Sequence, residues 1–370
     1  MRTQSSYTIR RFQTVDREAY LHLFRSVFDA RGVSWFRWKY EKNPYADGVP
    51  IVVAESGDEL VGARSFFALR MSDGESEFLA FQPCDTMVHP DHRRQGLMKE
   101  MTAHAIDAFA GDASFFFNTP NELALPANLD LGWRVVNEVA TYYRIERLRP
   151  RAPKGFGLAA DIIGDPVLKA YYDQFRRERT DRHATEFEIR RHSEVPSTRL
   201  ESLYKRAVPE TFHAIRDETF YEWRFENPRW QYRTYIANLA GRDVASIVTG
   251  TRSDGDATIT RLVDVLPLVQ PVDEDPVDDD LVDDDPFSAL LEAILTDHEA
   301  TDLFAVLSNS LPSHLLYDFG FLSDDSFPLS RVSDCLTLVA RPLTGSWELG
   351  GVRLDDPSNW TFTFAERDTS

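Results

Sequence analysis

The chain has 370 residues, 42% of them hydrophobic, and a formal net charge of −19. Its length predicts two domains, and its hydrophobic content supports packed cores. The strong negative charge argues against a surface for nucleic acid or anionic membranes. Two cysteines, Cys84 and Cys335, provide neither a disulfide framework nor a metal-binding set, so no metal is expected. Without an apolar run of spanning length or a signal peptide, a cytoplasmic protein that does not insert into membranes is expected.

The first part of the chain alternates between strand and helix patterns. Apolar residues recur at helical spacing in some segments and at every second position in others. The patterns predict a strand over 7–12, a helix over 16–28, a short helix over 34–40, a hairpin of 51–54 with 60–67, a strand from about 76, a helix over 97–109, a strand over 114–117, a short helix after Pro120, and a pair of strands between 133 and 147.

The segment from Asp85 to Met98 carries the strongest functional pattern. It begins as a strand, crosses a basic loop that contains Gly96, and ends as the start of an amphipathic helix. The first N–H groups of a helix have no partner inside it, and the helix dipole favours negative charge there. Gly96 lets the backbone approach a phosphate closely, and Arg93 and Arg94 add positively charged donors. The segment therefore predicts an anion site.

The residues from Val88 to Met98 resemble the acetyl-CoA loop of the GNAT acyltransferases, Val-x-Pro-x-x-Arg-x-x-Gly-x-Gly/Ala, at every position except Met98, where the family has a small residue. The resemblance implies an acetyl-CoA-dependent N-acetyltransferase. It also implies which residues bind this co-substrate: the backbone of Met87, Val88 and His89 at the thioester, and Arg93, Arg94, Gln95, Gly96, Leu97 and Met98 at the pyrophosphate.

The same resemblance points to the end of the next strand. In this family, side chains there commonly contact the pantetheine arm, which makes Asn118 and Asn121 candidates; a turn or a helix cap is the alternative for each. Many members protonate the departing thiolate with a Tyr four residues before a Gly-Phe pair. Here the pair is Gly132-Trp133, and Asn128 occupies the position of the Tyr. The usual acid is therefore absent.

Two residues near the loop are candidates for catalysis. Asp85 is either a general base or a buried residue that orients the strand, and Asp264, at a similar place in the second half, favours the structural role. His89 has the right chemistry for proton transfer at neutral pH, although a loop histidine can be merely solvated. Alternation along the strand also places Gln82 and Cys84 on the same face as Thr86 and Val88.

The second half of the chain repeats landmarks of the first in the same order. Ile189-Arg190-Arg191 echoes Ile9-Arg10-Arg11, and a segment ending in Asn227-Pro228 echoes one ending in Asn43-Pro44. We therefore expect an α/β (α+β) protein of two tandem GNAT-like lobes, each a mixed, mostly antiparallel sheet flanked by helices. The predicted boundaries are 1–148 for the lobe with the acetyl-CoA site, 149–184 for a linker with a helix over 166–179, 185–345 for a degenerate lobe, and 346–370 for a tail.

The second lobe lacks a phosphate loop in its sequence. Residues 271–285, which follow the strand that matches the one before Gly96, are rich in Asp and contain no Lys, Arg or Gly. Like charges disfavour a phosphate at close range. A solvated acidic loop is expected there instead.

Composition and motifs narrow the function further. The acidity resembles that of haloarchaeal proteins, and Asp85-Thr86, Phe117 to Asn121 and the tail with Asp368 resemble a GNAT subgroup associated with surface-polysaccharide genes. The implied partner is a small-molecule primary amine, such as an amino sugar, with no nucleic acid. A FemAB-like aminoacyl transferase and a non-catalytic acyl-CoA-binding protein are the alternatives. The acceptor and the oligomeric state, with a homo-oligomer as one option, stay open.

Overall fold

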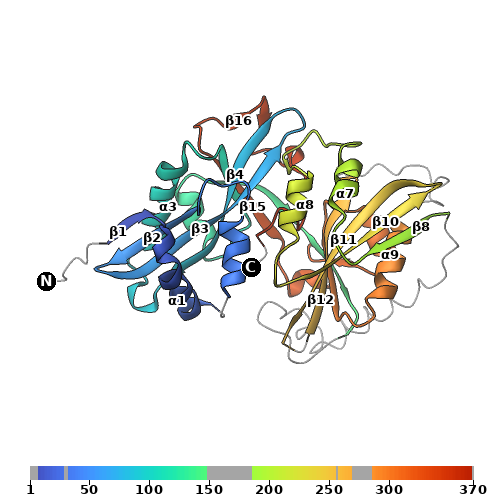
Figure 1. Ribbon diagram of the computed structural model, residues 1–370, viewed down its shortest axis with the longest axis horizontal. Helices are drawn as coiled ribbons and strands as arrows, with labels where there is room; N and C mark the ends of the chain where they lie inside the picture. Colours follow the sequence, from blue (N-terminus) through green and yellow to red (C-terminus); the bar gives the residue numbers. More distant parts are fainter. Residues whose placement is uncertain (1–6, 29–31, 148–185, 256, 269–285, 369–370) are drawn as a thin grey trace.

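A computed structural model describes residues 7–28, 32–147, 186–255, 257–268 and 286–368. The predicted linker helix over 166–179 and the acidic loop over 271–285 lie outside these residues. Two sheets form the two lobes, which lie side by side in Figure 1. In the part of the chain that the structure describes, no helix is both long and apolar enough to span a bilayer.

The first sheet is mostly antiparallel, and its one parallel pair of strands, β4 with β5, lies near its middle. A short strand, β9 (His213–Ala214), adds to the side of β3. The other strands lie in the order β1 (Thr8–Arg11), β2 (Ile51–Ser56), β3 (Glu59–Ser72), β4 (Glu77–Val88), β5 (Phe115–Asn118), β15 (Leu336–Pro342) and β6 (Arg134–Val139).

The second sheet has the same plan, with β12 and β13 as its parallel pair. A separate small hairpin joins β16 (Glu348–Leu349) to β17 (Val352–Arg353). From one edge to the other, the second sheet contains β8 (Glu188–His192), β10 (Gln231–Leu239), β11 (Arg242–Asp254), β12 (Ala257–Leu266), β13 (Leu303–Leu307), β7 (Thr141–Ile145) and β14 (Leu322–Ser323).

Helices cover both sheets, and buried apolar side chains hold them there. In the first lobe, for example, Leu97, Met101 and Ala105 pack one helix onto the sheet. The α-helices are α1 (Arg17–Val27), α2 (Val33–Phe36), α3 (Leu97–Phe109), α4 (Leu125–Asp130), α7 (Ser197–Tyr204), α8 (Glu218–Arg224), α9 (Pro286–Asp297) and α10 (Ser313–Asp318); the other helical turns are η1 (Thr14–Asp16), η2 (Arg37–Glu41), η3 (Pro90–His92), η4 (Leu329–Arg331) and η5 (Pro357–Asn359).

The two lobes exchange a strand. β7 belongs to the first lobe in sequence but pairs with β13 and β14 in the second sheet, whereas β15 comes from the second lobe and lies between β5 and β6 in the first. The two strands predicted between residues 133 and 147 are therefore present, but the prediction that they pair with each other was wrong. Each sheet therefore contains one strand from outside the residue range predicted for its lobe, because strand pairing here depends on distant segments.

Two equivalent tryptophans join the lobes near α8. The indole N–H of Trp38 donates to the carbonyl of Trp223 at 2.8 Å, and that of Trp223 donates to the carbonyl of Trp38 at 2.9 Å. Their rings stack 6.1 Å apart. One apolar core continues across this boundary, since Phe67 of β3 and Val263 of β12 belong to the same buried cluster. The lobes thus share one packed interface.

Candidate functional site

The site begins where two neighbouring strands separate. β4 and β5 pair only at Ala80 with Phe115 and at Phe81 with Phe116. Beyond these pairs β4 continues to Val88 and β5 to Asn118 without pairing with each other. The two strands leave a V-shaped opening whose facing backbone groups still need hydrogen-bond partners.

The register with β3 decides which backbone groups face this opening. The N–H of His89 donates to the carbonyl of Val61 at 2.8 Å, and Val88 lies opposite Gly62. In an antiparallel pair, residues alternate between pointing toward the partner strand and away from it. Of the three N–H groups predicted to contact a thioester, those of Met87 and His89 therefore point toward β3, and that of Val88 points into the opening. The side chain of Arg93 donates to the carbonyl of Val88 at 3.2 Å.

The loop at the wide end of the opening has the conformation of an anion site. Arg94 has φ 61° and Gly96 has φ 85°, both left-handed, and Gly96 caps the start of α3. Turns of this kind gather backbone N–H groups into anion-binding concavities, which a helix N-terminus reinforces. Leu97 is buried and anchors the helix, whereas Arg93, Arg94, Gln95 and Gly96 are exposed and Met98 is half-buried.

A bulge in β4 changes the direction of its side chains. Two residues, Asp85 and Thr86, lie opposite the single residue Arg64, and Asp85 has φ 43°. A bulge shifts the alternation of the strand by one residue. Cys84 consequently shares its core cluster with Met87, while Val88 packs on the opposite side of the sheet, with α3. The prediction that Cys84 faces the same side as Val88 was wrong for this reason.

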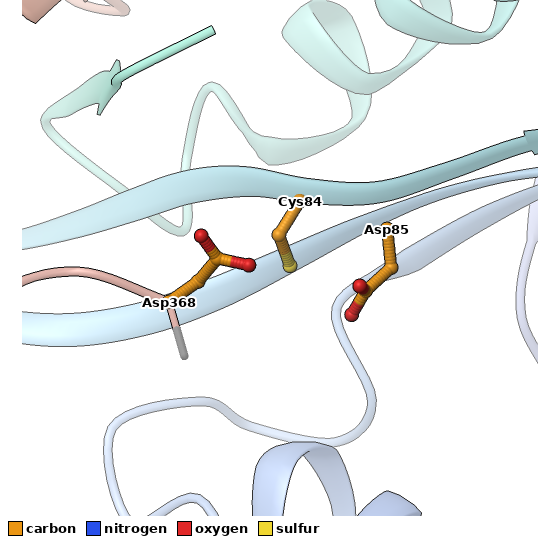
Figure 2. A group of neighbouring side chains, drawn as sticks. All are labelled: Cys84, Asp85 and Asp368. Carbon is orange, nitrogen blue, oxygen red and sulfur yellow. The ribbon is translucent and has the colours of Figure 1, made fainter. Parts of the chain in front are cut away.

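On the face of the sheet away from α3, two carboxylates share one lysine. The ammonium of Lys39 lies 2.6 Å from Asp85 and 3.1 Å from Asp368, and the hydroxyl of Tyr40 donates to Asp85 at 2.5 Å. Figure 2 shows Cys84 and Asp85 on β4 beside Asp368 from the C-terminal tail. Lys39 is completely buried, so these contacts provide its neutralising charge. We call Lys39, Asp85 and Asp368 the carboxylate cluster.

The two carboxylates differ in accessibility. The side chain of Asp85 is 4% exposed, whereas that of Asp368 is 21% exposed. Burial raises the pKa of Asp368, with a further contribution from the charge of Asp85, although Lys39 opposes the shift. Burial by itself would lower the pKa of Lys39, but the neighbouring negative charges, Asp85 first, raise it, and the lysine stays charged. Asp368 is thus the carboxylate that can take up a proton from outside.

Cys84, Asp85 and Asp368 also carry atoms of the kinds that bind metal ions. The Sγ of Cys84 and carboxylate oxygens of Asp85 and Asp368 lie within 4.8 Å of one another. However, burial raises the pKa of the Cys84 thiol well above its usual value, so the thiolate that metals bind is disfavoured. The ammonium of Lys39 already contacts both carboxylates. The three residues therefore fit an ion-pair cluster better than a metal centre.

Buried contacts hold the tail that carries Asp368. The side-chain oxygen of Gln82 accepts a hydrogen bond from the backbone N–H of Asp368, and its amide donates to the carbonyl of Glu366 at 3.1 Å. Arg224 of α8 donates to the carbonyls of Ala365, at 2.9 Å, and Arg367, also at 2.9 Å. The sequence pattern gives Asp368 no role beyond its place in the tail, and it does not single out Lys39. No sequence spacing connects residues 39, 85 and 368.

A second polar network lies on the α3 face of the same opening. Arg64, which is buried, donates to the hydroxyl of Thr86 and, at 3.4 Å, to the side-chain oxygen of Asn128. Asn128 donates in turn to Asn118 at 3.4 Å. Burial lowers the pKa of Arg64 to about 10. Among the residues described, no carboxylate forms an ion pair with this guanidinium, so Arg64 places a positive charge beside the position that lacks the usual Tyr.

The remaining predicted residues lie elsewhere. The side-chain oxygen of Asn121 accepts a hydrogen bond from the N–H of Ala124 at 2.9 Å, in the turn before α4, which is the turn role given as one of its alternatives. The ring of His89 lies 5.9 Å from that of His92, and its Nδ1 lies 3.9 Å from a carboxylate oxygen of Asp91. These side-chain contacts of His89 stay within its own loop and do not reach the carboxylate cluster.

Asp264 of the second lobe helps to interpret Asp85. It is buried and contacts Arg216, at 3.2 Å, and the hydroxyl of Tyr221, at 2.8 Å. A carboxylate held by one cation and one tyrosine therefore occurs in both lobes, although the second lobe lacks a phosphate loop in its sequence. This recurrence favours a structural role for Asp85.

We predict that Asp85→Asn lowers stability more than turnover. Removing one partner of a buried ion pair costs about 3–5 kcal/mol, and because Asp368 still neutralises Lys39 we expect a loss of about 2–3 kcal/mol. Chemical denaturation and steady-state kinetics on the same preparation measure the two effects. A variant of unchanged stability with a large loss of turnover and an altered pH profile would instead make Asp85 the base.

Comparisons with known proteins bear on the domain family and on the fold. Residues 8–135 match the family model of the acetyltransferase (GNAT) domain, so the first lobe carries such a domain and the predicted acyltransferase class is confirmed. No curated protein matches the sequence significantly.

Solved structures resemble the chain over most of its length. A GCN5-related N-acetyltransferase from Anabaena variabilis is 9% identical, with a TM-score of 0.58 over 91% of this chain and 73% of that one. One from Kribbella flavida is 13% identical, with a TM-score of 0.57 over 92% and 71% of the two chains. Eis1 from Mycobacterium abscessus is 12% identical, with a TM-score of 0.52 over 91% and 74%. These likenesses confirm the predicted mixed α/β fold.

Proposed function

We propose that this protein transfers the acetyl group of acetyl-CoA to a primary amine of a small metabolite, such as an amino sugar. The observation that carries the proposal is the V-shaped opening between β4 and β5, which has a phosphate loop at its wide end and the carboxylate cluster on one of its faces. Pyrophosphate at Arg93 to Met98 would place the pantetheine arm along the opening, as in an added strand.

The two faces of the opening suit different steps of the transfer. On one face, Asp368 takes the proton of the ammonium group, so that the nitrogen lone pair can attack the thioester carbon. The N–H of Val88 points into the opening and donates to the oxygen that becomes negative in the tetrahedral intermediate. When that intermediate collapses, the carbon–sulfur bond breaks and the sulfur leaves as a thiolate. The nitrogen gives its remaining extra proton to this thiolate, so that the products are the amide and CoA. On the other face, Arg64 stabilises this negative charge electrostatically, in the absence of the usual Tyr.

Release of CoA in the presence of a panel of primary amines tests the proposal. The wild-type protein should release CoA stoichiometrically with an acetylated product that mass spectrometry detects. A FemAB-like enzyme would require an aminoacyl donor instead, and a non-catalytic protein would bind acetyl-CoA without amine-dependent release. Either result would contradict the proposed reaction.

We also predict that one chain binds one acetyl-CoA. The fold alone would allow two sites, because both sheets contain the same parallel pair. However, CoA carries several negative charges, and the second lobe presents an Asp-rich sequence over 271–285 with no glycine or cation. Equilibrium dialysis should therefore saturate at one ligand per chain. Saturation at two would show that the second lobe binds CoA through other contacts.

A further inference from the structure

Three arginines gather between the second sheet and the C-terminal tail. The guanidinium of Arg261, on β12, lies 5.0 Å from the ring centre of Trp230 and 4.8 Å from that of Phe364. Arg252, on β11, lies 4.8 Å from Trp230, and Arg367, on the tail, lies 5.9 Å from Phe364. Arg261 therefore shares one aromatic neighbour with each of the other two. We call Arg252, Arg261 and Arg367 the arginine cluster.

Carboxylates do not neutralise the centre of this cluster. In the described ranges, Arg261 forms no ion pair, and the Nε of Arg367 is buried with no hydrogen-bond partner. The nearby Arg216 shows the contrast, because it pairs with both Asp264 and Glu366. Burial lowers the pKa of Arg261 to about 9, and the charges of Arg367 and Arg252 add to this shift. The positive charges of Arg261 and Arg367 both lie beside the ring of Phe364, and like charges so placed are unfavourable unless an anion joins them.

The position of the cluster connects it to the proposed reaction. Arg367 directly precedes Asp368, and adjacent Cα atoms lie about 3.8 Å apart. Arg261 is half-buried and is therefore not sealed in the core. A molecule with an anionic group at the arginines would thus place its other end near the carboxylate that accepts the proton of the amine.

We infer that the arginine cluster binds an anionic group of the acceptor, a carboxylate or a phosphate, and that the acceptor is therefore an amine that also carries negative charge. Planar guanidinium groups bind both anions through paired hydrogen bonds. This inference rests on the proposed function, since it concerns the second substrate of the same reaction. It also gives the second lobe a role in substrate selection, because Arg252 and Arg261 both belong to its sheet.

Calorimetric titration of the full chain tests the inference. The protein is first titrated with CoA, which must bind for the proposed function to hold, and then kept saturated so that the phosphate loop is occupied. Inorganic phosphate and malonate are titrated separately into this complex. We expect one anion site per chain, and the tighter of the two probes identifies the chemical class of the anion.

Three variants and one control variant make the titration specific. Arg261→Met and Arg367→Met should each weaken anion binding at least tenfold, with CoA affinity unchanged, while Arg261→Lys should retain part of the binding. Arg353→Met, at an exposed arginine paired with Asp355, is the matched control and should change nothing. Because Arg261 lacks a neutralising partner, Arg261→Met should not lower the thermal midpoint. Absence of anion binding to the CoA complex, or binding that Arg261→Met and Arg367→Met leave unchanged, would overturn the inference.

Discussion

Replacing Gly96 with aspartate should reduce acetyl-CoA affinity at least about 30-fold. Gly96 has φ 85°, and an L-residue in this left-handed conformation costs about 1–2 kcal/mol. The new carboxylate would also lie where a phosphate approaches, and two unit charges at 4 Å repel by about 1–4 kcal/mol between bulk water and a protein surface. Since 1.4 kcal/mol corresponds to a tenfold change, the sum of about 2–6 kcal/mol corresponds to a loss of about 30-fold or more.

Isothermal titration of the folded variant with acetyl-CoA measures this loss. Gly111→Asp is the matched control, because Gly111 is an exposed glycine just after the other end of α3, and an added Cβ there meets nothing within 4 Å. It introduces the same charge without disturbing the loop, so its affinity should equal that of the wild type. If Gly96→Asp also bound acetyl-CoA normally, the phosphate site would lie elsewhere.

Replacing Asp368 with asparagine should lower kcat about 10²–10⁴-fold, the usual contribution of a general base. Asparagine keeps the size of the side chain but cannot accept the proton of the ammonium group. Because Asp368 belongs to the tail and is partly exposed, stability should change less than in Asp85→Asn. We therefore expect Asp368→Asn to lower mainly the turnover and Asp85→Asn to lower mainly the stability.

The pH dependence gives a second measurement on the same variant. A base works when it is deprotonated, so the rate should fall as the pH falls through the pKa of Asp368. Burial raises that pKa, which places this acidic limb above about 3.9, the ordinary value for Asp. In Asp368→Asn the limb should disappear from the profile of kcat/KM. A profile that keeps the same acidic limb would assign the proton transfer to another group.

The sequence by itself determined the features that depend on local patterns. A strand, a glycine with φ 85° and an amphipathic helix follow one another from Asp85 to Phe109 as predicted, because hydrophobic periodicity and backbone freedom act over a few residues. Three other predictions were equally local: the hairpin of β2 and β3, the turn alternative for Asn121, and the absence of the usual Tyr at Asn128.

Only the tertiary structure decided which segments meet. The exchange of β7 and β15 depends on pairing between residues 158 to 227 positions apart, for which no periodic signal exists. The bulge at Asp85 adds one residue to β4 and reverses the faces on which the following side chains lie. The faces predicted from simple alternation were therefore wrong beyond this residue. Lys39, Asp85 and Asp368 converge because the tail packs between two lobes, and Arg64 reaches Asn128 across the opening. Long-range packing therefore created both faces of the candidate site, whereas the local sequence specified the glycine loop before α3.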